Sequence, residues 1–192
     1  MSTLKNNITA QRIQQLAQKG EVLFHTKDLA NLWQISHPNT LRVTLKRYVQ
    51  SGLLNRIHRG FYSLVPLNQI DPLLLGAKAI HQFCYLSLQS VLYPAGYVSQ
   101  PPSAHTFVSE KSKRFQMGDY KYIGRQLAPQ FLYHPEGIEI IDAVQRATPE
   151  RAIVDMLYFN PKVHFDKKIP WKKIRAIQQK IGYPLTPHRY LF

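Results

Sequence analysis

Acidic residues, cysteine and long apolar runs are all scarce in this sequence, and each scarcity excludes a class of protein. Asp and Glu account for 11 of the 192 residues and Lys and Arg for 25, so the formal charge is +14. A balance of this kind favours a polyanionic partner. The single cysteine, Cys84, cannot form an intramolecular disulfide, and its apolar neighbours predict a buried, unreactive thiol.

No apolar run in the sequence is long enough to cross a bilayer. The first residues also lack a signal-peptide pattern, because Asn6, Asn7, Gln11 and Arg12 interrupt every hydrophobic stretch there. We therefore expect a cytoplasmic protein without a membrane partner.

Catalytic and metal-binding signatures are missing from the sequence. It contains no GxxxxGK[ST], HExxH or GxSxG motif and no cysteine-based zinc pattern, and its histidines have no ligand-like spacing. Asp119 with Lys121, or Glu139 with Asp142, could hold a divalent cation and a phosphate in a nuclease. Alternation within a hairpin produces such pairs routinely. We predict no catalytic residue, no metal and no cofactor, and therefore no enzyme.

The positive charge is concentrated at the two ends of the chain. Residues 1–66 hold nine basic and two acidic residues, a net of +7, and residues 67–159 hold eight of each. Residues 160–192 hold eight basic residues against Asp166 alone, a second +7. A polyanion would therefore meet the terminal regions rather than the centre.

The segment from Ser36 to Phe61 predicts a basic amphipathic helix followed by a hairpin. Ser36 is a good N-cap, Pro38 suits the first helical turn, and Gly52 suits the end of the helix. At about 3.6 residues per turn, one stripe is apolar or small and contains Leu41, Thr44, Leu45 and Tyr48. The opposite arc is polar and basic and contains Asn39, Arg42, Val43, Lys46 and Arg47.

The residues of this arc have the chemistry of major-groove recognition. Asn39 could pair with adenine and Arg42 with guanine, while Val43 or the methyl group of Thr40 could meet a thymine methyl. Lys46 and Arg47 lie further along the helix, where phosphate contacts are expected. The alternative is a merely solvated helix face, which is what a run of charges on a helix usually is.

The surrounding elements favour DNA binding over a solvated face. A first helix ends near Gly20, Glu21 to Phe24 reads as a short strand, and Thr26 could cap a second helix. After the basic helix, strands at 53–57 and 61–65 are joined through His58, Arg59 and Gly60. The predicted order of helix, strand, helix, helix, strand, strand is that of a winged helix-turn-helix domain over residues 1–66.

Residues 67–192 predict a second domain of mixed helices and strands, beginning between Pro66 and Pro72. Helices are expected at 73–82, 85–97 with Ser87 as a cap, from Thr148 to Asn160, and at 170–182. Strands are expected at 105–109, 114–117, 120–124, 131–134 and 138–141, as an antiparallel meander. The predicted fold class is therefore α+β, with a winged helix-turn-helix followed by a mixed α/β domain that contains an antiparallel sheet.

The last predicted helix carries a basic side opposite an isoleucine stripe. This side contains Lys172, Lys173 and Lys180. It could form a second contact with DNA, or it could be a solvated face around a packed stripe, and the sequence leaves both open.

Three segments resemble the AbiEi-type antitoxins of bacterial abortive-infection systems. They are the RGFY sequence of the predicted hairpin at 59–62, YLSLQSVLYPAGYVSQ at 85–100 and ATPERAIVDML at 147–157. The similarity covers most of the chain in order. It implies the antitoxin of a type IV toxin–antitoxin system, whose winged domain binds inverted repeats in double-stranded DNA at its own promoter and represses the operon.

The same resemblance implies that the C-terminal domain counters a nucleotidyltransferase toxin without forming a stable complex with it. By position, DNA binding would fall to ten residues of the basic helix and hairpin: His37, Asn39, Thr40, Arg42, Val43, Lys46, Arg47, Arg56, His58 and Arg59. The TPER helix would be structural. Two alternatives stay open, a DNA nuclease targeted by the winged domain and a ligand-sensing transcriptional regulator without an antitoxin role.

Overall fold

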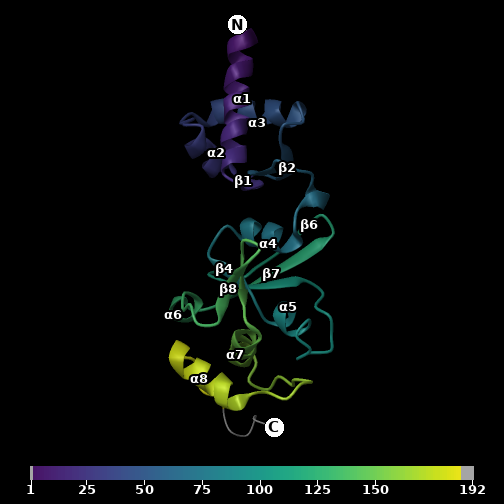
Figure 1. The fold of residues 1–192 in the computed structure, drawn as a ribbon, viewed down its shortest axis with the longest axis vertical. Helices are drawn as coiled ribbons and strands as arrows, with labels where there is room; N and C mark the ends of the chain where they lie inside the picture. The colour runs from purple at the N-terminus through teal and green to yellow at the C-terminus, as the bar shows by residue number, and fades with distance from the viewer. Residues whose placement is uncertain (1, 187–192) are drawn as a thin grey trace. The chain divides into compact units, whose positions relative to one another are not determined.

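The chain forms two compact units, which are described separately here. The computed structural model describes residues 2–186, with side chains from residue 7 onward. The units are Met1–Asp71 and Pro72–Phe192, and together their helices and strands confirm the α+β class (Figure 1). The sequence places the boundary after residue 66, whereas the structure assigns the short 3-10 helix η1 (Leu67–Gln69) to the first unit.

The first unit is a winged helix-turn-helix. Its elements follow the predicted order and are α1 (Ser2–Gln18), β1 (Leu23–His25), α2 (Thr26–Leu32), α3 (Pro38–Gln50), β2 (Asn55–His58) and β3 (Phe61–Ser63). The strands form an antiparallel sheet in the order β1-β3-β2, so the wing β2-β3 is fastened to the domain through β1. The core of the unit contains Leu16, Phe24, Leu29, Trp33, Leu41, Leu45, Tyr48 and Leu54.

Both predicted helix caps in this unit are displaced by one residue. His37, not Ser36, is the N-cap of α3, because Pro38 is the first helical residue and a proline forces the residue before it into extended backbone. His25, not Thr26, is the N-cap of α2, and its backbone N–H donates to Oδ2 of Asp28 at 2.9 Å. The C-terminal prediction for α3 is close: the helix ends at Gln50, and Gly52 has a φ of 72°.

The second unit is built on a mixed sheet with helices on both faces. Its strands are β4 (Cys84–Leu86), β5 (His105–Ser109), β6 (Lys113–Met117), β7 (Tyr120–Gln126), β8 (Ile138–Ile141) and β9 (Val144–Ala147), in the order β6-β7-β5-β4-β9-β8. Its helices are α4 (Pro72–Ile80), α5 (Gln89–Leu92), α6 (Pro129–Leu132), α7 (Pro149–Phe159) and α8 (Trp171–Ile181). Helix α4 lies on one side of the sheet and α7 and α8 on the other (Figure 1).

The sheet departs from the predicted antiparallel meander. Neighbouring pairs β4-β5, β6-β7 and β8-β9 are antiparallel, but β5-β7 and β4-β9 are parallel. The reason lies in the hairpin β6-β7, whose second strand carries the buried Tyr122 and therefore takes the inner position beside β5. The more polar β6 is left at the sheet edge.

Three local predictions in this unit are wrong. The helix expected at 85–97 is instead the end of β4, a connecting turn and the four-residue α5. The strand expected at 131–134 overlaps helix α6, which begins at Pro129, and β9 was not predicted. Strand β4 is buried along its whole length, so it lacks the alternation that distinguishes a strand from a helix in the sequence.

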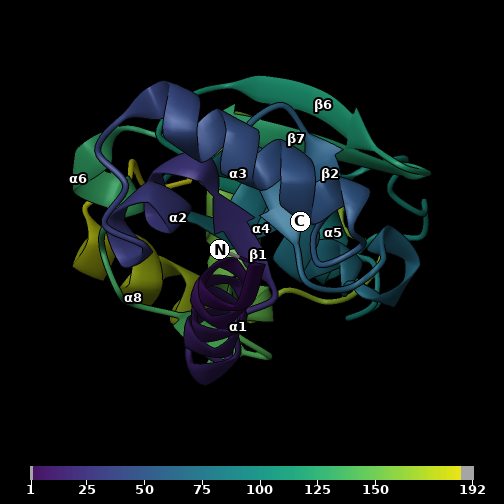
Figure 2. The same cartoon turned by 90° about the horizontal axis from the view of Figure 1, so that it is seen from above.

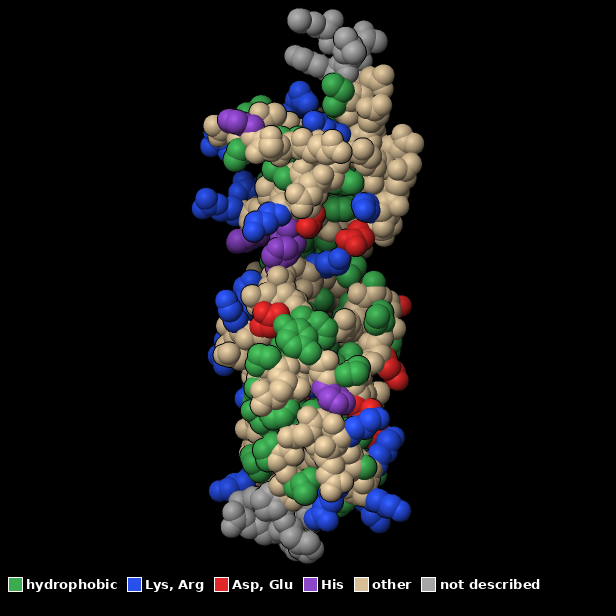
Figure 3. Space-filling view, turned by 90° about the vertical axis from the view of Figure 1, so that its left-hand side faces the viewer, with side chains coloured by type: hydrophobic (Ala, Val, Ile, Leu, Met, Phe, Trp, Pro, Cys, Tyr) green, Lys and Arg blue, Asp and Glu red, His purple; other side chains and the backbone are tan. Residues whose placement is uncertain are grey.

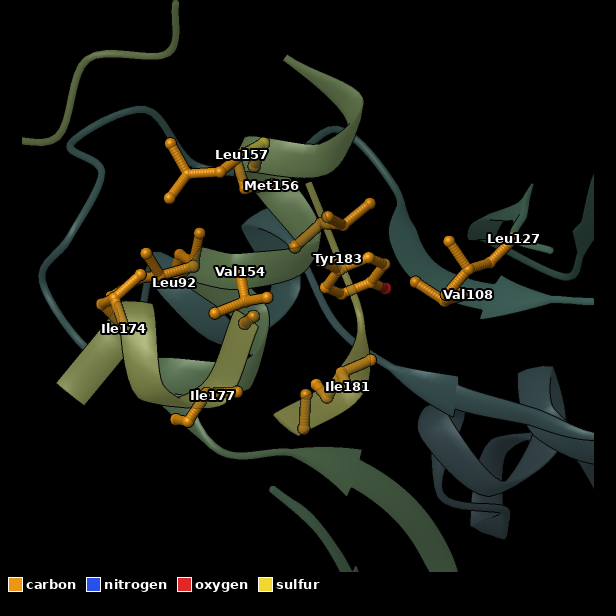
Figure 4. Packing of buried hydrophobic residues seen from close by; sticks show 14 of the residues in the cluster. Leu92, Val108, Leu127, Val154, Met156, Leu157, Ile174, Ile177, Ile181 and Tyr183 are labelled. Atoms are coloured by element: carbon orange, nitrogen blue, oxygen red, sulfur yellow. The ribbon is translucent and has the colours of Figure 1, made fainter. Parts of the chain in front are cut away.

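The predictions for α7 and α8 are confirmed. Oγ1 of Thr148 accepts a hydrogen bond from the backbone N–H of Arg151 at 3.3 Å, Pro149 opens α7, and the helix stops before Asn160. Helix α8 ends at Ile181, and the residue after it, Gly182, has a φ of 84°. The two helices pack their apolar faces together beneath the sheet, where Val154, Ile174, Ile177 and Ile181 meet in the core of the unit (Figure 4).

Candidate nucleic-acid interface

Helix α3 has one buried and one exposed face, as its sequence predicts. Leu41, Thr44, Leu45 and Tyr48 are buried, so the predicted inner stripe is confirmed. The six predicted contact residues of the helix lie on the exposed side: Asn39, Thr40, Arg42, Val43, Lys46 and Arg47. His37 is exposed at the N-cap. Val43 keeps 62% of its surface in solvent, which is unusual for a branched apolar side chain on an otherwise polar face.

Aromatic contacts hold α3 in place against the rest of the unit. The rings of Tyr48 and Trp33 meet edge to face at 5.6 Å, and the Tyr48 hydroxyl donates to Oγ1 of Thr9 at 3.5 Å. On the outer side, the guanidinium of Arg47 lies 5.5 Å from the Tyr48 ring centroid. The exposed arc therefore stands on a rigid, well-packed base, which a recognition helix requires.

The wing presents its three predicted contact residues to solvent. Arg56, His58 and Arg59 are exposed, and a bulge between Arg56 and His58 alters the alternation of β2 at this point. The tip turns through Gly60, whose φ of 79° favours glycine. The backbone N–H of Thr26 donates to the Gly60 carbonyl at 2.9 Å, which fastens the tip of the wing to the start of α2.

A groove of about 580 Å³ runs between α3 and the wing. Leu41, Leu45 and Tyr62 contribute apolar walls to it. Its basic lining residues come from both elements and are Arg42, Lys46, Arg56 and Arg59. Figure 2 shows α3 and β2 lying next to each other, and Figure 3 shows Lys, Arg and His side chains gathered on one side of this unit. Tertiary structure thus joins two basic segments that are separate in the sequence.

The cations of this surface have no acidic partners. Within residues 7–186, none of Arg42, Lys46, Arg47, Arg56 and Arg59 forms an ion pair. Gln50 and Tyr62 also line the groove and were not predicted. The position of Gln50 could have been found from the sequence, because it lies four residues after Lys46 and eight after Arg42 on the same side of the helix.

The basic side of α8 is arranged differently. Nζ of Lys173 donates to Oε1 of Glu150 at 2.6 Å, and Lys180 forms an ion pair with Glu136. These hydrogen bonds lower the pKa of Glu150 and of Glu136 and raise the pKa of Lys173. Lys172 is exposed and forms no ion pair with any described residue. Two of the three lysines that could form a second DNA contact therefore already form ion pairs with glutamates of their own unit.

The two pairs considered as alternatives for a nuclease, Asp119 with Lys121 and Glu139 with Asp142, lie in different hairpins of the sheet. Asp119 lies in the turn between β6 and β7 and Asp142 in the turn between β8 and β9, at opposite edges of the sheet. Asp142 pairs with Arg146 at 3.3 Å. No group of three or more His, Cys, Asp or Glu side chains in the described part of the chain is arranged to hold a metal ion. Burial raises the pKa of Cys84 to about 12, in keeping with the predicted unreactive thiol.

The most elaborate polar cluster lies in the core of the second unit and centres on Arg151. Its Nε donates to Oδ1 of Asp155 at 3.0 Å, and its other N–H groups donate to the Tyr85 hydroxyl at 2.7 Å and to backbone carbonyls of Phe131, His134 and Glu136. The hydroxyls of Ser87 and Tyr183 each donate to Asp155 at 2.8 Å. This cluster was not predicted from the sequence, although a charged i,i+4 pair on an apolar helix was a usable signal.

Every charge and donor of this cluster is satisfied, which identifies it as structural. Both side chains of the Arg151–Asp155 pair are fully buried. Burial alone would lower the pKa of Arg151, but Asp155, followed by Tyr85 and Tyr183, raises it, so the guanidinium stays charged. Burial and then the negative Asp155 raise the pKa of Tyr85 and of Tyr183. The cluster fastens α7 to β4, to the segment 131–136 and to the segment after α8.

Comparison with known proteins adds little to this geometry. No protein-family model matches the chain, and no curated protein sequence matches it significantly. One solved structure that the chain partly matches is the Rv2827c protein from Mycobacterium tuberculosis, which shares 14% sequence identity. The alignment covers 96% of this chain and 70% of that one, with a TM-score of 0.49.

None of the helices within residues 2–186 is long and apolar enough to cross a membrane.

Proposed function

We propose that this protein is a DNA-binding transcriptional repressor that contacts its operator through α3 and the wing. The main support is the exposed set of ten predicted residues, which includes five Lys and Arg side chains without acidic partners among the described residues. Four of these five, Arg42, Lys46, Arg56 and Arg59, line one groove. Unpaired basic side chains on a rigid helix and wing are suited to phosphate oxygens and base edges.

The two parts of the surface would have different roles, one in base contacts and the other in phosphate contacts. Asn39, Thr40, Arg42 and Val43 lie in the first half of α3, the half that reads bases in helix-turn-helix proteins. Lys46, Arg47 and the wing residues Arg56, His58 and Arg59 would bind phosphates and set the register. Specificity would then reside in the start of α3, and affinity in the combined basic surface.

We also propose that the repressor is an AbiEi-like antitoxin of a type IV toxin–antitoxin system. It would repress its own operon at inverted repeats and counter a nucleotidyltransferase toxin in the cytoplasm without a stable complex. This part of the proposal is supported by the resemblance of segments 85–100 and 147–157. Both segments enter the core of the second unit, where Arg151 of one donates to the Tyr85 hydroxyl of the other.

Operator binding is tested with DNA from upstream of the protein's own gene and with unrelated DNA of equal length. We expect Arg42→Ala to weaken binding to the upstream fragment by about 1–3 kcal/mol, because alanine cannot form the bidentate hydrogen bonds of arginine with guanine. Arg175→Ala on α8, which removes an equally exposed arginine, is the matched control. Equal affinity of Arg42→Ala and the wild type for the upstream DNA would contradict the assignment.

Antitoxin activity is tested by co-expression with the nucleotidyltransferase toxin that the proposal places in the same operon. We expect the wild-type protein to restore growth, and Arg42→Ala to restore it as well when both genes are driven from an external promoter. The reason is that Arg42 lies in the winged unit, whereas neutralisation is assigned to the second unit. Failure of the wild-type protein to restore growth would contradict the antitoxin role and leave only the proposal of a repressor.

A further inference from the structure

A second groove lies on the second unit, on the sheet face beside α5. It consists of two adjoining hollows of about 490 and 590 Å³, which share Gln89, Thr106 and Ile123 as lining residues. Small-molecule sites in proteins have volumes of about 300–1,000 Å³. None of the residues predicted to bind DNA takes part in this groove.

One half of the groove is cationic and contains two arginines. Arg114 pairs in register with Ile123 across β6-β7, so its side chain lies on the same sheet face as Arg125, two residues further along β7. Arg125 is half-buried, and its guanidinium lies 4.1 Å from the ring centroid of Phe159. Burial, and then the charge of Arg114, lower the pKa of Arg125.

Neither arginine has an acidic partner among the described residues. Two guanidinium groups held close together without a carboxylate repel each other, and an anion between them would relieve this repulsion. Ser112 lines the same half and adds a hydroxyl donor. This half therefore has the composition of a phosphate site.

The other half of the groove has no lysine or arginine among its lining residues and combines apolar with uncharged polar groups. Its apolar walls come from Val98, Pro101, Pro102, Ala104 and Val163. Ser99, Gln100, Ser103 and His164 add polar groups, and Asp166 adds a carboxylate. The backbone N–H of Ser99 donates to Oδ2 of Asp166 at 2.5 Å, and the N–H of Asp166 donates to the Tyr97 carbonyl at 3.0 Å. These bonds tie the proline-rich loop to the segment around residue 164 and hold the walls in place.

Gln89 lines both hollows, so it marks the junction between the two halves. Its amide is half-buried and forms no hydrogen bond with a described residue. The residue before it, Leu88, is fully buried with a φ of 56°, a conformation that a leucine keeps only where its surroundings impose it. The free amide is thus held at the groove with one donor group and one acceptor available, as hydrogen bonding to the edge of a base requires.

We propose that this groove binds a nucleoside phosphate. The phosphates would lie on Arg114 and Arg125, the nucleoside would lie in the other half, where apolar walls and polar groups are both present, and Gln89 would hydrogen-bond it at the junction. The two halves together favour this class over inorganic phosphate, which would occupy the cationic half alone. Binding at this site does not depend on operator binding, because all of its residues belong to the second unit.

The test is calorimetric titration of the full-length protein with ATP at physiological salt. Adenosine and tripolyphosphate serve as probes that lack the phosphates or the nucleoside. We expect ATP to bind with a Kd below roughly 1 mM. We expect Arg114→Gln to raise this Kd at least tenfold, because it removes one of the two guanidinium groups that would hold the phosphates. Gln89→Ala should weaken ATP binding while leaving tripolyphosphate binding unchanged.

One variant separates a specific site from general attraction to a basic protein. Arg175→Gln makes the same charge change at an exposed position on α8 and should bind ATP like the wild type. Arg114 is exposed at a sheet edge, so its variant should keep the wild-type melting temperature.

Several results would overturn the proposal. They are no ATP binding by the wild-type protein, equal weakening in Arg114→Gln and Arg175→Gln, or tripolyphosphate binding as tightly as ATP. A single-stranded oligonucleotide that binds through Arg114 while ATP does not would assign the groove to a nucleic-acid strand instead.

Discussion

The two units use arginine and lysine in opposite ways. In the winged unit, the five cations of α3 and the wing are exposed and have no acidic partner within residues 7–186. In the second unit, Arg151 is fully buried against Asp155, and Lys173 and Lys180 pair with Glu150 and Glu136 at the surface. A basic residue that pairs with an acidic residue of its own unit stabilises the fold. A basic residue without such a pair is available to bind another molecule.

The same rule applies to Arg114 and Arg125 within the second unit. They have no carboxylate partner among the described residues, whereas Arg146, Arg151, Lys173 and Lys180 of this unit each have one. Net charge alone could not have shown this, because residues 67–159 are neutral by count. The distribution of counter-charges therefore says more about partners than the total charge does.

The largest expected effect is on the buried pair. Arg151→Met should lower the free energy of unfolding of the second unit by about 3–5 kcal/mol, because Asp155 would remain buried without its cation. Urea denaturation followed by circular dichroism measures the change. Arg42→Met is the matched variant in the winged unit and should leave stability within about 0.5 kcal/mol of the wild type. Similar destabilisation in both variants would contradict the view that Arg151 stabilises the fold and Arg42 does not.

A smaller effect is expected on the salt dependence of DNA binding. Lys46→Gln should reduce the slope of log K against log salt by about 0.9, which is the contribution of one side chain that neutralises a phosphate. Changing Lys172, Lys173 and Lys180 together to Gln should leave the slope unchanged, because two of these lysines already pair with carboxylates. A flatter slope in the triple variant would place α8 in the DNA interface and weaken the contrast between the units.

The smallest effect is a pH dependence confined to the second unit. Lys180 and Lys173 lower the pKa values of Glu136 and Glu150 below their usual 4.5 in the folded protein. These pairs therefore stabilise the fold above pH 4.5, and the stabilisation is lost as the pH falls through the lowered values.

Melting temperatures at a series of pH values measure this dependence. The Tm advantage of the wild type over the double variant Lys173→Met, Lys180→Met should be small near neutral pH and should disappear in acid. Lys172→Met is the control and should follow the wild type throughout. An advantage that persists in acid would mean that the lysines stabilise α8 by packing rather than by charge.

Much of the winged unit was predictable because its signals are local. The stripe of Leu41, Leu45 and Tyr48 has helical spacing, and the order of elements follows from successive helix and strand patterns. The caps were misplaced by one residue because the effect of Pro38 on His37 competes with the cap preference of Ser36. The exposed candidate residues follow from the same periodicity, so all ten were found on the surface.

The second unit was less predictable because its pairings are distant in sequence. Strand β4 pairs in parallel with β9, about 60 residues away, and no local pattern indicates that partner. Ser87 was read as a helix cap, but its hydroxyl donates to Asp155, 68 positions along the chain. The second groove also depends on such long-range packing, because it joins residues from α5, α7, β5, β6, β7 and the connecting loops.

By itself, the sequence determined the winged helix-turn-helix, its outward basic residues, the cap and extent of α7, and the isoleucine stripe of α8. These features depend on periodicity and on capping within a few residues, which operate before any distant contact forms. Only the tertiary structure decided which cations keep a counter-charge: it buried Arg151 with Asp155, paired Lys180 with Glu136, and left Arg114 beside Arg125 without a carboxylate. The physical reason is that a charge acts over a few ångströms of space, and folding alone decides which residues come that close.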